Sequence, residues 1–520
     1  MTSLRTALVA ALALAVPRPA SAFCGFYVAG GDQKMFNDAT QVVLMRLGTR
    51  TVLAMQNNYK GPPEAFAMVV PVPTVLHEGD VKTLPKEVFA HVEQMGAPRL
   101  VEYWEQDPCA PDVVYDYPPS APAGMAMAKS ETENKPADHG VTIEAKFTVG
   151  EYNVLILSAK EATGLETWLH EQKYTIPPGA EPLLRPYVEG GMKFFVAKVD
   201  PAKVKFVDGR AALSPLRFHY DSDDFALPIR LGLANSSGTQ DLIVDILAPS
   251  KRFEVANYKN VFIPTNIDVD DSVKAKFGAF YAALFDRTIE KNPGAVVTEY
   301  AWQATTCDPC PGPALDGNDF ATLGADVLTG SADKPSAYGN GDFVLTRLHA
   351  RYGKDVKDDL HFKDAQPVVG GREFVRDGGK LEEGARPDSQ NNFQGRYAIR
   401  HEWTGALACA KPIRHRWGGP QSEIANAPGF QPTGTKAATD LAFAPRGAIQ
   451  LAAAVRRDVP EIDLKADALH AEVPAPGSNS AKPAPVVADK KKSGCGCATH
   501  DASGALVGGL ALLLLRRRRR

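Results

Sequence analysis

The chain has 520 residues, of which 44% are hydrophobic and 23% are charged, and its formal net charge is −3. This length suffices for two or three domains with apolar cores, and 44 glycines with 40 prolines favour many turns and short strands. No stretch interleaves basic with aromatic residues, which argues against a nucleic-acid-binding protein, so no nucleic-acid partner is predicted.

The first 22 residues have the form of a secretory signal peptide. Arg5 precedes an apolar run at residues 7–16, and residues 20–22 (Ala-Ser-Ala) fit a cleavage site. The mature chain is therefore predicted to begin at Phe23, in an exported protein.

Strands are expected next. Apolar runs at residues 41–46 and 50–55 flank a turn with Gly48, which predicts a β-hairpin. Residues 66–73 end in Val-Pro-Val-Pro, typical of an edge strand or a strand end. A helix is predicted from Thr83, and its apolar face consists of Val88, Phe89, Val92 and Met95.

Several of these stretches resemble a bacterial family that is catalogued as domain of unknown function number 2330. The resemblance rests on Phe-Cys-Gly-Phe at residues 23–26, the hairpin, and residues 58–73. Further matching segments are residues 150–158, 194–199, 215–218 and 345–352. The resemblance spans most of residues 23–410 and implies an exported protein, but it supplies no activity and no catalytic residues.

The middle of the chain predicts alternating strands and helices. Residues 118–140 are rich in Pro, Ala, Lys and Glu, which indicates an exposed insertion. Residues 152–157 are mostly apolar, which predicts a buried strand. Ser158 and Glu161 have the spacing of a capping box, which predicts a following helix with Leu165, Trp168 and Leu169 inward. Other expected elements are strands at residues 194–199, 215–220, 228–234, 242–247 and 343–352, a helix at residues 273–289, and a loop at residues 370–395.

The fold class predicted is α+β, with β-rich mixed or antiparallel sheets and a few packed amphipathic helices. The first α+β region is expected at residues 23–250 and the second at 251–460, followed by a flexible stalk at residues 461–492. Glu-Tyr near residue 102 precedes Asp-Pro-Cys109, and Glu-Tyr near residue 299 precedes Asp-Pro-Cys310. Two related halves or a chance match both fit this short repeat.

Five cysteines lie between the leader and the tail: Cys24, Cys109, Cys307, Cys310 and Cys409. In an oxidising compartment they are disulfide candidates. Because their number is odd, at least one cysteine is free or pairs outside the chain. Cys307 and Cys310 have the spacing of a redox dithiol, but Pro-Gly-Pro follows where a helix should start. Structural disulfides are therefore favoured, with predicted bridges from this pair to Cys409 and from Cys24 to Cys109.

No catalytic residue can be assigned, and neither a cofactor nor a metal is predicted. His349, His361, His401 and His415 either meet at a metal or are separate core and surface histidines, and the second interpretation is favoured. Two aspartate runs, at residues 221–224 and 268–271, lack the glycine and glutamate of a calcium-binding loop and favour turns. No nucleophile elbow, phosphate-binding loop or dinucleotide motif occurs.

The tail, residues 493–520, has a Cys-Gly-Cys motif with Cys495 and Cys497, an apolar run at residues 502–515 and five terminal arginines. This order resembles the myxobacterial sorting signal MYXO-CTERM, which implies a sortase-like processing protease and lipid attachment at the cysteines. The apolar run is shorter than the about 20 residues that span a membrane. A simple membrane tail anchor is the alternative.

The sequence thus predicts an exported protein that is anchored at the cell surface and has a structural or binding role, with an unknown surface ligand. The alternatives are an exported hydrolase-like enzyme with unassigned catalytic residues and a redox protein that uses Cys307 and Cys310. A cleft that gathers titratable side chains would separate these possibilities.

Overall fold

A computed structural model of the chain describes residues 20–21, 26–29, 36–60, 66–110, 141–172, 174, 176, 179–204, 206–207, 210–211, 213–235, 238–328, 342–372, 375–376, 380–382, 384–422, 436–437 and 447–467. The described residues all belong to one compact unit. Residues 468–520, the expected insertion at residues 118–140 and most of the leader lie outside the described residues.

The largest sheet among the described residues has 14 strands and contains the expected hairpin, β3 (Phe36–Leu47) and β4 (Arg50–Lys60). Next to β3 lies β15 (Gln240–Pro249), which pairs with all ten residues of β20 (Phe343–Tyr352). β20 in turn pairs with β19 (Val296–Gln303). Because β3 and β20 flank β15, one sheet crosses the expected boundary at residue 250.

The smaller strands of this sheet are β1 (Ala20–Ser21), β6 (Val81–Thr83), β11 (Phe206–Val207), β12 (Arg210–Ala211), β13 (Leu216–Asp221), β17 (Asn260–Phe262), β22 (Val368–Gly370), β25 (Arg386–Pro387) and β26 (Asn392–Gln394). β25 and β26 lie in the segment that was expected to be a loop, residues 370–395, and β22 ends at its first residue. They form strands because β26 pairs with β19 of the sheet.

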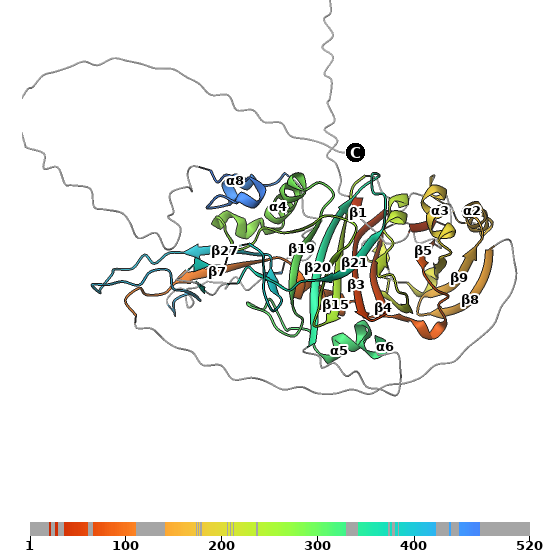
Figure 1. The fold of residues 1–520 in the computed structure, drawn as a ribbon, viewed down its shortest axis with the longest axis horizontal. Coiled ribbons are helices and arrows are strands. Elements are labelled where there is room, and N and C mark those ends of the chain that lie inside the picture. Colours follow the sequence, from red (N-terminus) through yellow and green to blue (C-terminus); the bar gives the residue numbers. More distant parts are fainter. Residues whose placement is uncertain are drawn as a thin grey trace, which may run out of the picture. The chain divides into compact units, whose positions relative to one another are not determined.

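A second sheet has the order β2-β5-β10-β9-β8. It consists of β2 (Phe26–Ala29), β5 (Phe66–Val72), β8 (Val141–Val149), β9 (Tyr152–Ala159) and β10 (Lys193–Val199). The helices α2 (Ala162–Glu171) and α3 (Glu181–Glu189) pack on it through a shared apolar core (Figure 1). Leu165, Trp168 and Leu169 are buried there, as predicted. The prediction of a capping box at Ser158 and Glu161 is wrong, because α2 has no side-chain cap and the Ser158 hydroxyl donates to Glu144 instead.

A third sheet contains β7 (Arg99–Glu105) and β27 (Arg396–His401), which run parallel and side by side (Figure 1). Its other strands are β18 (Ile267–Asp268), β28 (Trp417–Gly418) and β29 (Lys436–Ala437). Two small sheets consist of β14 (Ala226–Leu227), β16 (Arg252–Val255) and β21 (Leu360–Ala365), and of β23 (Val375–Arg376) and β24 (Lys380–Leu381).

The long helix of the second half is α4 (Phe277–Lys291), which starts four residues later than predicted because a 3₁₀ turn, η4 (Asp271–Ala275), precedes it. Phe277, Tyr281 and Leu284 are buried as expected. The earlier helix is α1 (Glu87–Gly96), and it buries its predicted apolar face. Shorter helices are α5 (Gly317–Phe320), α6 (Asp326–Leu328) and α8 (Leu451–Ala454).

Two further expected elements differ from the structure. The strand expected at residues 228–234 is replaced by a 3₁₀ helix, η3 (Arg230–Asn235), because the backbone N–H groups of Ile229 and Arg230 donate to Asp359. The stalk expected from residue 461 begins inside packed structure, since Ile462 of η8 (Pro460–Ile462) is 1% exposed.

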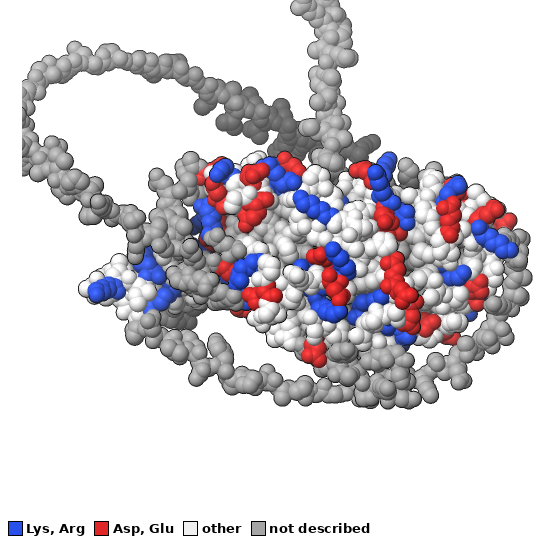
Figure 2. Space-filling view, viewed as in Figure 1, with Lys and Arg blue, Asp and Glu red and all other residues white. Residues whose placement is uncertain are grey.

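The fold is α+β, as predicted. Among the described residues, no helix is both long and apolar enough to cross a membrane. On the visible face in Figure 2, acidic and basic side chains alternate across the surface that is not grey.

Candidate functional site

A row of charged side chains crosses the central strands of the large sheet beneath α4. Side chains alternate between the faces of a strand, so Arg347, His349 and Arg351 of β20 point to the same face. Asp241 and Asp245 of β15 lie in register opposite Arg351 and Arg347. All five are buried except Arg351, whose side chain is 17% exposed. The sheet therefore carries charges of both signs in its interior.

Glu299 of β19 completes this set, which is called the charge network below. The register of β19 against β20 shifts at this residue, and such a bulge re-aims a side chain. The Glu299 carboxylate accepts a hydrogen bond from the Tyr281 hydroxyl. It also accepts one from Nε of Arg347, at 2.7 Å, and it is hydrogen-bonded to Nδ1 of His349, also at 2.7 Å. Burial opposes ionisation, but the charges of His349 and Arg347 outweigh it and lower the pKa of Glu299 to about 2.

His349 is held between two carboxylates. Its Nε2 lies 3.1 Å from Asp241, which also accepts from Nε and Nη2 of Arg351 at 2.8 and 3.0 Å. Phe285 of α4 stacks on the imidazole at 3.6 Å between ring centroids. Burial opposes protonation of His349, yet Glu299 and Asp241 raise its pKa. Burial likewise opposes ionisation of Asp241, but His349 and Arg351 lower its pKa to about 2.

Asp245 behaves differently from the other carboxylates of the network. It accepts one hydrogen bond from Gln41 at 2.9 Å, and its distance to Nη1 of Arg347 is 3.9 Å. Arg347 instead bonds Glu93 of α1 at 2.6 Å. Burial therefore dominates and raises the pKa of Asp245 to about 7.

A cavity of about 600 Å³ lies at the end of β20, beside the C-terminal end of α4. Arg351 belongs both to the charge network and to the wall of this cavity. The wall also has Thr239, Glu290, Lys354 and Asp355 as polar members. Its apolar members include Ile229, Tyr258, Ile289, Val296, Tyr352 and Leu360. The cavity is thus a mainly apolar space next to a buried polar chain.

Four of the predicted cysteines form two disulfides. Cys109 is bonded to Cys409, and Cys307 is bonded to Cys310. The expected bridges from Cys24 to Cys109 and from the Cys307–Cys310 pair to Cys409 are therefore wrong. The parallel pairing of β7 with β27 brings Cys109 and Cys409 together across 300 residues. Cys24, Cys495 and Cys497 lie outside the described residues.

The four histidines that were considered as metal ligands do not meet. His349 belongs to the charge network, and Nδ1 of His361 lies 3.0 Å from Asp224. His415 stacks on Trp417, with ring centroids 6.2 Å apart. In the first aspartate run, Asp221 is bound by Arg50 at 2.8 Å. These three histidines are therefore separate side chains, whereas Asp221 is the last residue of strand β13 and not a turn residue as expected.

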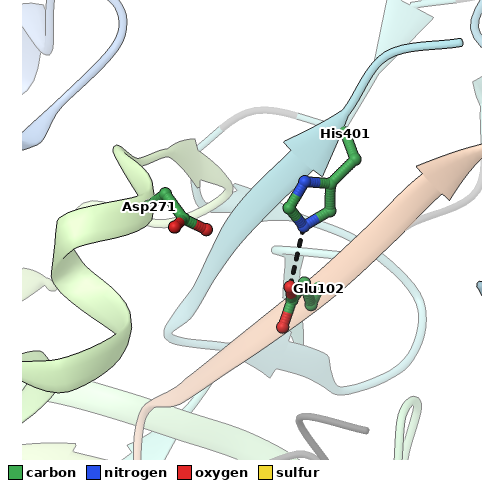
Figure 3. Close-up of side chains that lie close together, drawn as sticks. All are labelled: Glu102, Asp271 and His401. Carbon is green, nitrogen blue, oxygen red and sulfur yellow. Dashed lines mark hydrogen bonds and ion pairs between the residues drawn. The ribbon is translucent and has the colours of Figure 1, made fainter. Parts of the chain in front are cut away.

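His401 does lie close to two carboxylates, Glu102 of β7 and Asp271 of η4, as Figure 3 shows. The possible ligand atoms lie within 4.8 Å of one another, and Nε2 of His401 is 2.7 Å from Glu102. Such donors suit a divalent cation. However, Nζ of Lys274 lies 2.9 Å from Glu102 and already supplies positive charge. The carboxylate of Glu102 is therefore already paired with His401 and Lys274.

Residues 18–363 match the family described as an uncharacterized protein conserved in bacteria (DUF2330). The chain belongs to this family. The DUF2330 span includes the charge network and the cavity, whereas His401 and Cys409 lie beyond it. It is shorter than the expected span of residues 23–410. No curated protein and no solved structure matches the chain.

The charge network of this DUF2330 protein was not predicted from the sequence, although residues 346–352 have a pattern that indicates a charged strand face. They read Thr-Arg-Leu-His-Ala-Arg-Tyr, in which charged residues alternate with apolar ones. In a strand this pattern usually indicates one solvent face. Here α4 covers that face, and carboxylates from β15 and β19 neutralise it.

Proposed function

We propose that the protein is an exported bacterial binding protein, anchored at the cell surface, that holds a small and largely apolar molecule in the cavity beside α4. The cavity carries this proposal. Its volume of about 600 Å³ falls within the roughly 300–1,000 Å³ of small-ligand sites. Its walls are mainly apolar, with a few polar groups that would fix a ligand's orientation.

The charge network supports binding through apolar contact rather than through charge. Arg351 reaches the cavity wall, but its guanidinium donates to Asp241 through two nitrogens and to Asp286 at 2.6 Å through the third. It has little capacity left for an anionic ligand. Both ring nitrogens of His349 are likewise bonded to carboxylates, so this imidazole is poorly placed to act as a general base on a bound molecule.

Export and surface anchoring are supported by the cysteines and by both ends of the chain. Disulfides persist in oxidising compartments, and two are present among the described residues. The leader of residues 1–22 would direct export, and the tail of residues 493–520 would be removed by a sortase-like protease. The retained Cys495 and Cys497 would carry the membrane anchor.

A cavity-filling variant tests the binding site. An added Cβ on Gly353 would meet its nearest atom, Cα of Thr239, at 3.9 Å, so the backbone tolerates a side chain there. Both residues line the cavity, and Gly353→Phe would occupy it. Gly79→Phe is the matched control, because an added Cβ there meets no atom within 4 Å and Gly79 does not line the cavity.

The probe is the neutral fluorescent dye N-phenyl-1-naphthylamine, titrated into the folded exported protein and both variants. We expect saturable binding of one dye per chain, unchanged in Gly79→Phe and at least about tenfold weaker in Gly353→Phe. Circular dichroism confirms that both variants are folded. Equal dye affinity in the two variants, or no saturable binding to the parent protein, would overturn the proposal.

A further inference from the structure

We propose that the Cys307–Cys310 disulfide is a thiol–disulfide exchange site. The reacting sulfur is Sγ of Cys310, and the substrates are accessible thiols and disulfides in the exported compartment. The two disulfides of the described residues differ in span, since one joins cysteines 300 residues apart and the other cysteines only three apart. A cross-link restrains the unfolded chain more as its loop lengthens. Cys109–Cys409 is therefore the structural bridge, and Cys307–Cys310 contributes least to holding the fold.

The two sulfurs of the short bridge also differ in access. Cys310 is exposed, whereas Cys307 is half-buried and packs against the apolar cluster that α1 shares with the large sheet. An incoming thiolate can reach Cys310 without opening this cluster. Exposed and readily attacked disulfides are the labile ones, while shielded bridges resist reduction.

The loop that carries the two cysteines, residues 307–311, is held by side chains from other elements. Nε2 of Gln94 donates to the Pro311 carbonyl at 2.9 Å, and Nη1 of Arg99 donates to the Pro309 carbonyl at 2.9 Å. Nε2 of Gln394 donates to the Asp308 carbonyl. None of these bonds depends on the S–S bond. The loop can therefore keep its shape when the bridge is reduced, with both thiols still close together.

Arg99 also brings positive charge to this loop. Its side chain is fully buried, and it forms no ion pair among the described residues. The carbonyl it binds belongs to Pro309, which directly precedes Cys310. The charge of Arg99 also acts on Asp308, the acidic residue of this loop, and so offsets a carboxylate that would disfavour the thiolate form of the cysteines.

The chemistry is balanced with small thiols as the reductant. A thiolate attacks Sγ of Cys310, the S–S bond breaks, and Cys307 leaves as a thiolate that takes a proton. A second thiolate attacks the sulfur of the bound small thiol, which releases Cys310 and forms a small disulfide. Two thiols are oxidised and one protein disulfide is reduced; the reverse sequence oxidises the pair.

The test uses the folded exported protein in buffers of reduced and oxidised glutathione, followed by alkylation and peptide mass spectrometry. We expect Cys307–Cys310 to equilibrate reversibly with the buffer, while Cys109–Cys409 stays oxidised as the internal control. Simultaneous reduction of both bridges only on unfolding would overturn the proposal. So would a Cys307–Cys310 bridge that stays oxidised at every glutathione ratio.

Single-cysteine variants test which sulfur reacts. Cys307→Ser retains the exposed Cys310, and Cys310→Ser retains the half-buried Cys307. With oxidised glutathione, we expect the mixed disulfide to form about tenfold faster in Cys307→Ser than in Cys310→Ser. Equal rates, or faster reaction of Cys307, would contradict the assignment of Cys310 as the reacting sulfur.

Discussion

Glu299 and His349 lie on neighbouring strands, and a 2.7 Å hydrogen bond joins their side chains, neither of which is exposed to solvent. Taking such charges out of water costs much of what their attraction returns, so the intact pair adds little net stability. Removal of one partner is different, because it leaves the other charge buried without compensation.

Glu299→Gln should therefore destabilise the fold, by up to the about 3–5 kcal/mol of a broken buried ion pair, since His349 would keep only Asp241 and Arg347 would keep Glu93 as its bonded carboxylate. The free energy of unfolding in urea measures the loss. Glu290→Gln is the control, because the Glu290 side chain is 64% exposed and should change stability by less than about 0.5 kcal/mol. A similarly small loss in Glu299→Gln would contradict the structure of the charge network.

Asp245 should make stability fall as pH rises between about 4 and 7. Burial raises its folded pKa from 3.8 to about 7, so the folded state binds the proton more tightly than the unfolded state does. This contribution is complete below the unfolded pKa and is lost as pH rises through 7. Asp245→Asn removes the titration, and its urea unfolding free energy should decline less over this range than that of the parent protein.

Asp241 and Glu299 give the opposite sign, because their folded pKa values are lowered to about 2. Their contribution to stability is present above their unfolded pKa values and is lost as pH falls through 2.

The Asp245 prediction has a clear contrary outcome. If the unfolding free energy declines equally from pH 4 to 7 in the parent protein and in Asp245→Asn, Asp245 does not titrate with a raised pKa.

Phe280→Ala should cost about 3–5 kcal/mol in unfolding free energy, as is usual for truncation of a buried phenylalanine. Phe280 of α4 is 0% exposed and meets the ring of Tyr397 of β27 edge-on, with centroids 5.2 Å apart. The variant therefore tests whether α4 joins the large sheet to the third sheet. A loss typical of surface sites, below about 0.5 kcal/mol, would place this helix outside the core.

Joint replacement of Cys109 and Cys409 by Ser should lower stability by about 2–5 kcal/mol, the usual effect of removing a native disulfide. The bridge closes a very long loop, so its loss frees the unfolded chain. Differential scanning calorimetry gives the melting temperature of the variant and of the parent protein. An unchanged melting temperature would show that the bridge does not restrain the unfolded chain.

Replacement of Cys495 and Cys497 by Ala should block processing of the tail and leave a larger species in the inner membrane. The apolar run of residues 502–515 is too short for a durable span, so the arginines after it would hold the segment only while it is cut. Mass spectrometry of surface-isolated protein should find Phe23 at the N-terminus and no terminal arginines. An intact Arg516–Arg520 end at the surface would restore the simple tail anchor.

The elements that could be predicted are those with strong local patterns. The β3–β4 hairpin, the buried face of α1 and strand β20 follow from periodicity and from the turn at Gly48, whose φ is +57°. The strand expected at residues 228–234 fails because its backbone is bound by Asp359, about 130 residues away in the chain. No local pattern records such a distant partner.

The candidate site depends almost entirely on such distant contacts. Arg347 meets Glu93, Glu299 and Asp245 only after α1, β19 and β15 pack around β20. The disulfide pairing likewise follows from strands β7 and β27 lying together, whereas the spacing of the cysteines leaves many pairings open. Sequence periodicity can place these residues on a strand, but not in a network.

Strand β1 lies within the proposed leader, so cleavage of the leader would change the edge of the large sheet. Its residues, Ala20 and Ser21, pair in parallel with Gln240 and Asp241 at the start of β15, and the next residue back, Thr239, lines the cavity. Cleavage after Ala22 would take both β1 residues away with the leader. The precursor would then differ from the mature protein at the cavity's border, where two backbone positions of β15 lose their partner. If the leader is removed on export, as proposed above, its removal would uncover this edge of β15 in the mature protein alone.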